Sequence, residues 1–165
     1  MFDKPFALEI LTPEKTVLTA QAVSVSAPGV QGGFQVLVGH APLLSTLEHG
    51  RVIVRGQDGT LLTYATSGGF LEVRDNHVRV LLDTAERVDE IDVERAQAAR
   101  ERAERRLRER AAGVDVPRAE AALRRALNRL RTANVSWTPY PALRTTGPVF
   151  IFDHPPMIAI LVHRS

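Results

Sequence analysis

The feature that most constrains the fold is a change of sequence pattern at Asp83. Before it, from Ala7 to Leu82, short apolar stretches are separated by Gly, Pro, Asp and Asn at a spacing typical of an all-β sandwich. After it, the chain from Ile91 to Ala112 consists mainly of Ala, Arg, Glu and Leu with helical spacing. A chain of 165 residues is long enough for one buried domain with an appendage. The pattern therefore predicts an all-β sandwich of about ten strands followed by helices.

Local signals in the first half predict individual strands. Val23 and Val25 alternate with serines, which places both valines on one face of a half-buried strand. Residues 51–55 and 61–65 flank an Asp-Gly turn, so we expect them to form one hairpin. Residues 77–82 are expected to be the last strand.

A narrow stripe of small apolar residues runs along each half of the helical region. In the first helix, expected over residues 91–112, the stripe consists of Ala96, Ala99, Ala103 and Leu107. In the second, expected over residues 117–133, it consists of Ala119, Ala122, Leu123, Ala126, Leu130 and Ala133. Gly113 is expected to end the first helix, and Asp115 to cap the second. Because apolar burial yields only ~25 cal/mol per Å², contacts between alanines hold the helices together weakly. We expect an antiparallel α-helical hairpin that can detach and repack.

The sequence thus divides into three parts. Residues 1–86 are assigned to the β-sandwich, residues 87–134 to the helical hairpin, and residues 135–165 to a proline-rich tail without an assigned role. The tail contains two apolar runs, residues 149–152 and 157–162, and both are too short to span a bilayer. No apolar stretch approaches ~18 residues, so we expect membrane association only through a partner protein.

Composition and motifs exclude several classes of function. The chain has no cysteine, which rules out disulfides, zinc-thiolate sites and cysteine nucleophiles. It contains no Walker-type phosphate-binding motif, no Gly-x-Ser-x-Gly and no His-Glu-x-x-His. Its five histidines lack the spacing of metal ligands, and a net charge of +2 with interleaved signs creates no strong positive field. We therefore expect no catalytic residue, no metal and no nucleic-acid partner.

Three strings in the sequence resemble one protein family. They are Gly39–Leu44 (GHAPLL), Ser67–Val73 (SGGFLEV) and Asp83–Ala96 (DTAERVDEIDVERA), and each lies at a boundary between expected elements. In this order they resemble the epsilon subunit of the bacterial F-type ATP synthase. The resemblance spans roughly residues 7–134.

The resemblance implies a function and a set of partners. It implies a non-catalytic subunit of the central stalk, the rotor, that links the gamma shaft to the c-ring and takes part in coupling proton flow to ATP synthesis. The helical hairpin would contact the catalytic alpha/beta hexamer and restrain ATP hydrolysis. The protein would lie on the cytoplasmic face of the cell membrane as a peripheral component of the complex.

The resemblance also implies contact residues on the sandwich. The expected interface with the rotor and the c-ring comprises Gly32, Gly33, Phe34, Gly39, His40, Ala41, Pro42 and Leu43. From the residues themselves, the glycines permit unusual backbone angles and the proline fixes a tight turn. The same strings are therefore equally consistent with a purely structural role in two turns.

A regulatory ATP site is the remaining expectation, with no other cofactor. Some relatives bind ATP through an Ile/Leu-Asp-x-x-Arg-Ala motif followed by arginines, and the corresponding residues here are Glu86, Ile91, Asp92, Arg95, Ala96, Arg102, Arg125 and Arg129. By this analogy Ile91 and Asp92 face the adenine, while the arginines gather the phosphates, which guanidinium groups bind well. The alternative interpretation is a solvated helix face, or one that contacts acidic surfaces of the hexamer.

Two other classes of function stay open on the sequence. One is a free-standing interaction module or adaptor with a helical arm. The other is a small β-rich enzyme whose site is assembled from distant residues, which converging carboxylates or histidines in a pocket would favour.

Overall fold

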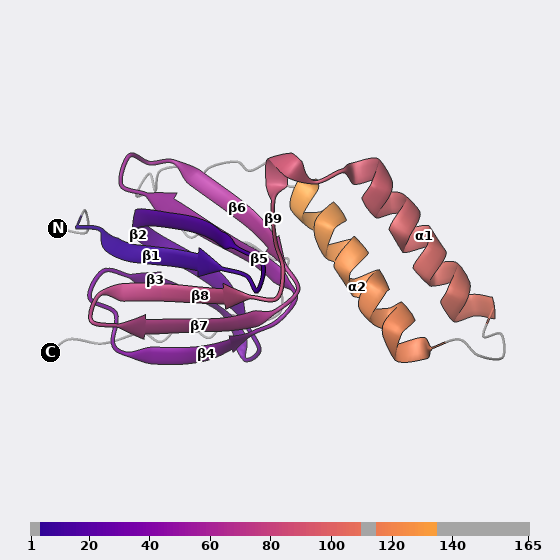
Figure 1. Cartoon of the computed structure of the whole chain (residues 1–165), viewed down its shortest axis with the longest axis horizontal. Coiled ribbons are helices and arrows are strands. Elements are labelled where there is room, and N and C mark those ends of the chain that lie inside the picture. The colour runs from indigo at the N-terminus through magenta and orange to yellow at the C-terminus, as the bar shows by residue number, and fades with distance from the viewer. Residues whose placement is uncertain (1–3, 110–114, 135–165) are drawn as a thin grey trace, which may run out of the picture. The chain divides into compact units, whose positions relative to one another are not determined.

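The computed structural model describes residues 4–109 and 115–134. In this part of the chain nine strands precede a 3-10 turn and two helices (Figure 1), which confirms the predicted β-sandwich and hairpin. The elements are β1 (Phe6–Leu11), β2 (Thr16–Gly29), β3 (Gly32–Leu37), β4 (Leu43–Leu47), β5 (Gly50–Gly56), β6 (Leu61–Thr66), β7 (Gly69–Arg74), β8 (His77–Leu82), β9 (Ala85–Arg87), η1 (Val88–Glu90), α1 (Val93–Glu109) and α2 (Val116–Ala133).

All nine strands belong to one hydrogen-bonded sheet that folds over on itself. The strand order is β1-β8-β7-β4-β2-β5-β6-β9, with β3 paired to β2. The strand β2 is 14 residues long and pairs with β1 along its first part and with β3 and β5 along its second part. It therefore joins the two layers. The strand β1 runs antiparallel to β2 and parallel to β8, between which it lies (Figure 1).

The core lies between the two layers and is built by alternating residues. In β1 and β8, every second side chain is almost fully buried, among them Phe6, Leu8 and Ile10. The predicted hairpin is confirmed as β5 and β6, with Arg55 opposite Leu61. Its turn is tied by Asp58, whose Oδ1 accepts a hydrogen bond from the Thr60 N–H at 2.9 Å.

The predicted alternation in β2 was wrong in its phase. Val25 is fully buried, but Val23 is only half-buried, and Ala22 and Ser24 point inward instead. The cause is a β-bulge: between Ala22 and Ser24 the pairing with β5 slips by one residue. Because side chains alternate with a period of two, one extra residue moves every following side chain to the other face.

Residues 77–82 form β8, but they are not the last strand. The strand β9 follows and pairs with the end of β6, with Glu86 opposite Ala65. It has only three residues, two of them charged, so no alternation marks it in the sequence.

An aspartate caps each helix: the cap at Asp115 was predicted and is confirmed, whereas the cap at Asp92 was not predicted. The Asp92 Oδ1 accepts a hydrogen bond from the Arg95 N–H at 2.8 Å, and the Asp115 Oδ1 accepts one from the Arg118 N–H at 3.0 Å. These carboxylates satisfy N–H groups that helix starts leave free. The alanine stripes face each other, with Ala96 and Ala103 of α1 and Ala119, Ala126 and Leu130 of α2 buried.

Two expectations fall outside the part of the chain that the structure describes: the helix end at Gly113 and the assignment of residues 135–165. Within residues 4–109 and 115–134, neither helix combines the length and apolar character needed to cross a membrane.

Candidate functional site

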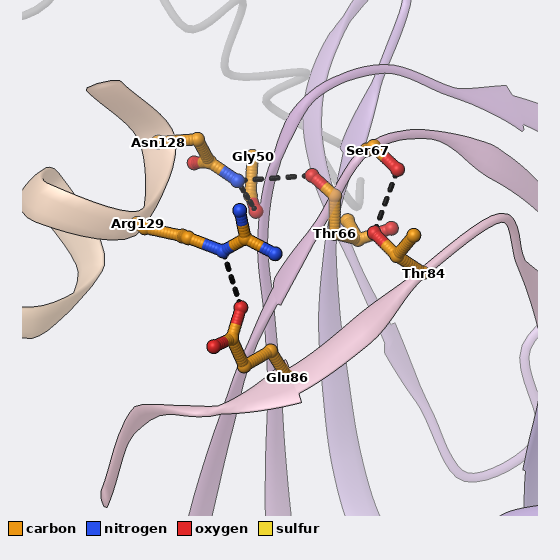
Figure 2. Close-up of polar contacts among 7 residues, drawn as sticks. All are labelled: Gly50, Thr66, Ser67, Thr84, Glu86, Asn128 and Arg129. Carbon is orange, nitrogen blue, oxygen red and sulfur yellow. Dashed lines mark hydrogen bonds and ion pairs between the residues drawn. The ribbon is translucent and has the colours of Figure 1, made fainter. Parts of the chain in front are cut away.

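The second helix meets the sandwich through two neighbouring side chains. The Asn128 Nδ2 donates hydrogen bonds to the backbone oxygens of Gly50 and Thr66, both at 2.9 Å. The Arg129 Nε donates to the Glu86 carboxylate, and the two side chains form an ion pair (Figure 2). These contacts join α2 to β5, β6 and β9.

The turn after β6 is fixed by its own hydrogen bonds. The buried Thr66 hydroxyl donates to the backbone oxygen of Gly68 at 3.1 Å and accepts from the Gly68 N–H at 3.2 Å. The hydroxyls of Ser67 and Thr84 lie 2.7 Å apart (Figure 2). Because β9 begins directly after Thr84, this turn sets where Glu86 stands relative to α2.

A narrow cleft lies at this junction. It is lined by Ala65, Thr66, Ser67, Thr84, Glu86, Arg125, Asn128 and Arg129. Its volume is about 10 Å³, which is roughly the room that one water molecule needs. A triphosphate does not fit inside it in this conformation.

The structure brings together three of the residues expected to bind ATP. Glu86, Arg125 and Arg129 line the same cleft, and Glu86 and Arg129 already neutralise each other. Ile91 and Ala96 are buried, at 8% and 3% exposure, and so present little surface to a ligand.

The remaining residues of that set are exposed and lie at the start of α1 or on it. Asp92 caps the helix through its carboxylate, and Arg95 and Arg102 are exposed. Arg95 and Arg102 are seven residues apart, so they lie on one face of α1. A groove of about 760 Å³ lies between the two helices, on the opposite face of the hairpin from these arginines. Its lining includes Val93, Gln97, Leu127, Leu130 and Arg131. Helical spacing puts Arg125 and Arg129 on the same side of the hairpin as Arg95 and Arg102.

His49 lies next to this junction, and its surroundings shift its pKa. Burial lowers the pKa of His49, and the positive charges of Arg124 and Arg125 lower it further, whereas Asp83 and Glu48 oppose the shift. The neutral form is therefore favoured while α2 is in place. His49 precedes Gly50, which accepts the hydrogen bond from α2.

The residues expected at the rotor interface fall into two separate turns. Gly32 and Gly33 open β3, whereas residues 39–43 follow its end, about 17 Å away at ~3.3 Å per residue. Phe34 packs against the core between them. The two groups of expected interface residues therefore lie at opposite ends of β3.

The second of these turns is well tied. Gly39 has a φ of +72°, an angle that favours glycine, and its N–H donates to the Asn76 Oδ1 at 3.2 Å. The His40 Nδ1 lies 2.8 Å from the Ala41 backbone oxygen. This string therefore has a structural role, while the side chains of His40, Ala41 and Pro42 stay exposed.

Sequence reasoning missed an exposed apolar face on the sandwich. Leu44 of β4, Phe70 of β7 and Leu81 of β8 are exposed by 73%, 50% and 43%. Phe70 stands directly opposite Leu81 in the β7–β8 ladder, and Leu44 lies two residues from Thr46, the partner of Phe70 in β4. The signal was present, because Leu44 and Phe70 belong to the family-like strings, but only the register shows that they share a face.

Two family models match consecutive parts of the chain, together residues 5–134. The model described as "ATP synthase, Delta/Epsilon chain, beta-sandwich domain" matches residues 5–88. The model described as "ATP synthase, Delta/Epsilon chain, long alpha-helix domain" matches residues 89–134. This chain belongs to the ATP synthase delta/epsilon family.

Curated relatives support this family assignment and are named as epsilon chains. The chain is similar to the ATP synthase epsilon chain of Moorella thermoacetica, with 59% identity over 103 residues, which cover 62% of this chain and 77% of the relative. The epsilon chain of Anaeromyxobacter sp. is 53% identical over 100 residues, covering 61% and 75%. That of Herpetosiphon aurantiacus is 47% identical over 106 residues, covering 64% and 77%. The resemblance to the epsilon subunit is thereby confirmed.

A solved structure supports the fold. A chain in the mitochondrial ATP synthase of Euglena gracilis, from its OSCP/F1/c-ring assembly, superposes with a TM-score of 0.65 at 24% identity and covers 73% of this chain and 76% of that one. As an epsilon-type member of the family, the chain is a component of an ATP synthase complex. The alternative of a free-standing adaptor is not favoured. In the described residues no three His, Asp or Glu side chains converge as a metal site requires.

Proposed function

We propose that this chain is the non-catalytic rotor subunit of a proton-translocating F-type ATP synthase. In this proposal the sandwich binds the gamma shaft and sits on the c-ring at the cytoplasmic face of the cell membrane. The observation that carries it is the exposed apolar face of Leu44, Phe70 and Leu81 on a member of the epsilon family. A contiguous apolar face on a small domain marks a protein contact.

The gamma contact is tested by changing that face. Phe70→Ser with Leu81→Ser removes two exposed apolar side chains while the buried face of each strand stays intact. The matched control is Leu37→Ser, which changes a leucine of similar exposure, 42%, on β3. We expect the double variant to lose co-purification with gamma and the control to retain it. Equal binding by both would refute the assigned face.

The hairpin is proposed to restrain ATP hydrolysis. Its helices meet mainly through alanines, which bury little apolar area, so the compact hairpin can open and reach the catalytic alpha/beta hexamer. Removing residues 91–134 from a reconstituted complex should raise the rate of ATP hydrolysis while assembly stays intact. An unchanged rate at low ATP would remove this role.

ATP is proposed as the regulatory ligand of the compact hairpin. Four arginines, Arg95, Arg102, Arg125 and Arg129, lie on one side of it, and they suit a triphosphate. Since Arg129 is paired with Glu86 and the cleft is narrow, the phosphates would bind on the open side and draw Arg129 from Glu86. ATP would then shift the equilibrium from the open to the compact hairpin, to the extent that it binds the compact hairpin more tightly than the open one.

Calorimetry on the whole chain tests the ATP site. Arg125→Ala should weaken ATP binding by about 1–3 kcal/mol, the range for losing a charged hydrogen-bond partner. Arg131→Ala is the matched control, because Arg131 is on the same helix but lines the groove on the other side. No heat of binding at millimolar ATP, or equal effects of the two variants, would show that the arginines belong to a solvated or protein-facing surface.

A further inference from the structure

The face of α2 that meets the sandwich is polar. Arg125, Asn128, Arg129 and Thr132 follow one another at helical spacing, whereas the buried Ala126 belongs to the stripe that faces α1. Thr132 is 1% exposed, and its hydroxyl has no hydrogen-bond partner among the described residues. Apolar burial therefore does little to hold α2 on the sandwich, and directional polar contacts decide where it sits.

Of these contacts, the two made by Asn128 have the most specific geometry. Gly50 and Thr66 stand directly opposite each other in the ladder of β5 and β6, where β5 begins and β6 ends. Each offers its backbone oxygen to the same nitrogen, at 2.9 Å (Figure 2). A carboxamide carries two N–H donors on one nitrogen, so a single side chain can bind both strands at once.

The neighbouring ion pair is less able to hold the helix. The Arg129 and Glu86 side chains are 40% and 30% exposed, and ion pairs at such exposure are screened by solvent. In contrast, Thr66 is 1% exposed, so its backbone oxygen would lose a partner that water cannot easily replace. Asn128 also lies between Arg125 and Arg129, and so its position sets theirs.

We propose that Asn128 is the positioning residue of the compact state: its carboxamide clamps α2 to β5 and β6, and loss of its two donors releases the hairpin from the sandwich. The clamp is a property of the isolated chain and needs no nucleotide. Only its expected effect on ATP hydrolysis rests on the proposed function.

Asn128→Asp is the sharpest test, because it keeps the shape of the side chain and exchanges both donors for a carboxylate oxygen. That oxygen would face two backbone oxygens, which repel it. Asn128→Ala removes the donors without adding repulsion, so it should release the hairpin less. Asn134→Asp is the matched control, since it makes the same chemical change at an exposed residue at the end of α2.

Release of the hairpin from the sandwich can be measured as the distance between two spin labels, one on each part of the full chain. The protein has no cysteine, so Thr46→Cys in β4 and Arg118→Cys in α2 can carry two spin labels at exposed positions. Pulsed EPR should give one narrow distance distribution for the parent chain and for Asn134→Asp. For Asn128→Asp we expect a second, broad population, with the docking equilibrium shifted roughly tenfold or more. Circular dichroism should show unchanged helix content.

Two results would overturn the clamp. One is a parent-like distance distribution for both Asn128 variants. The other is a loss of helix content in Asn128→Asp together with parent-like docking in Asn128→Ala, which would mean that Asn128 supports the helix only. In a reconstituted complex, Asn128→Asp should lower ATP hydrolysis. Released hairpins with unchanged hydrolysis would uphold the clamp and count against the proposed restraint on hydrolysis instead.

Discussion

Replacing Gly69 by alanine should destabilise the sandwich more than the same change at Gly32 or Gly33. Gly69 opens β7 with a φ of +140°, and a Cβ at this position would lie 2.0 Å from the Leu81 backbone oxygen and 2.9 Å from the Leu82 Cα. The backbone angle costs about 1–3 kcal/mol for a residue with a side chain. Moving β8 aside to make room costs about 1–3 kcal/mol more. We therefore expect Gly69→Ala to lower the free energy of unfolding by about 2–6 kcal/mol.

Two other glycines separate these contributions. Gly32 has a φ of +122° but nothing within 4 Å of a Cβ, so Gly32→Ala should show only the backbone cost of about 1–3 kcal/mol. Gly33 has an ordinary φ, and its Cβ would come no closer than 3.9 Å to the Ala27 backbone oxygen, so Gly33→Ala should be nearly neutral. Urea denaturation of the full chain, followed by circular dichroism, measures all three variants. If Gly69→Ala costs no more than Gly32→Ala, the close approach of β7 and β8 is not what requires glycine.

Three further predictions follow from other contacts. A chain that ends after η1 should keep a cooperative urea transition, because no residue of α1 or α2 belongs to the core of the sandwich; a molten fragment would contradict this. Burial and the charges of Arg124 and Arg125 lower the pKa of His49 from 6.5. The chain with α2 docked on the sandwich therefore binds fewer protons than the chain with α2 released. Docking should therefore be strongest above pH 6.5 and weaken as pH falls below it. The spin-label distance at about pH 5.5 and about pH 8 measures this, and His49→Gln should abolish the difference. Asp115→Ala should cost about 1 kcal/mol of helix stability, seen as lower helix content on heating, because the cap on the Arg118 N–H is lost.

Much of the fold could be predicted because its signals are local. Turn residues at regular spacing marked the sandwich, and Asp115 marked the start of the second helix, whereas the cap that Asp92 provides for the first helix was not predicted. The bulge at Val23 could not be predicted, because it is defined by a slip in the pairing with β5, a strand far along the chain. The three residues of β9 carry no pattern, since their strand character comes from the edge of β6.

The candidate site was predictable only in part, for a similar reason. The spacing of Arg125 and Arg129 was visible, and the structure brings both to the same cleft as Glu86. In contrast, a single asparagine in a helix looks like any surface residue, so Asn128 gave no signal. Its partners are backbone oxygens, and these have no side-chain identity that a sequence could display.

The place of β1 between β2 and β8 also sets an order for protein synthesis. The first strand made cannot complete its pairing until β8, which is encoded 71 residues later counting from Phe6 to His77, has been made. Pairings over such sequence distances form slowly compared with helices. The helical hairpin follows β9 in the chain. During synthesis α2 therefore leaves the ribosome only after β5, β6 and β9, the strands that it contacts, have been made.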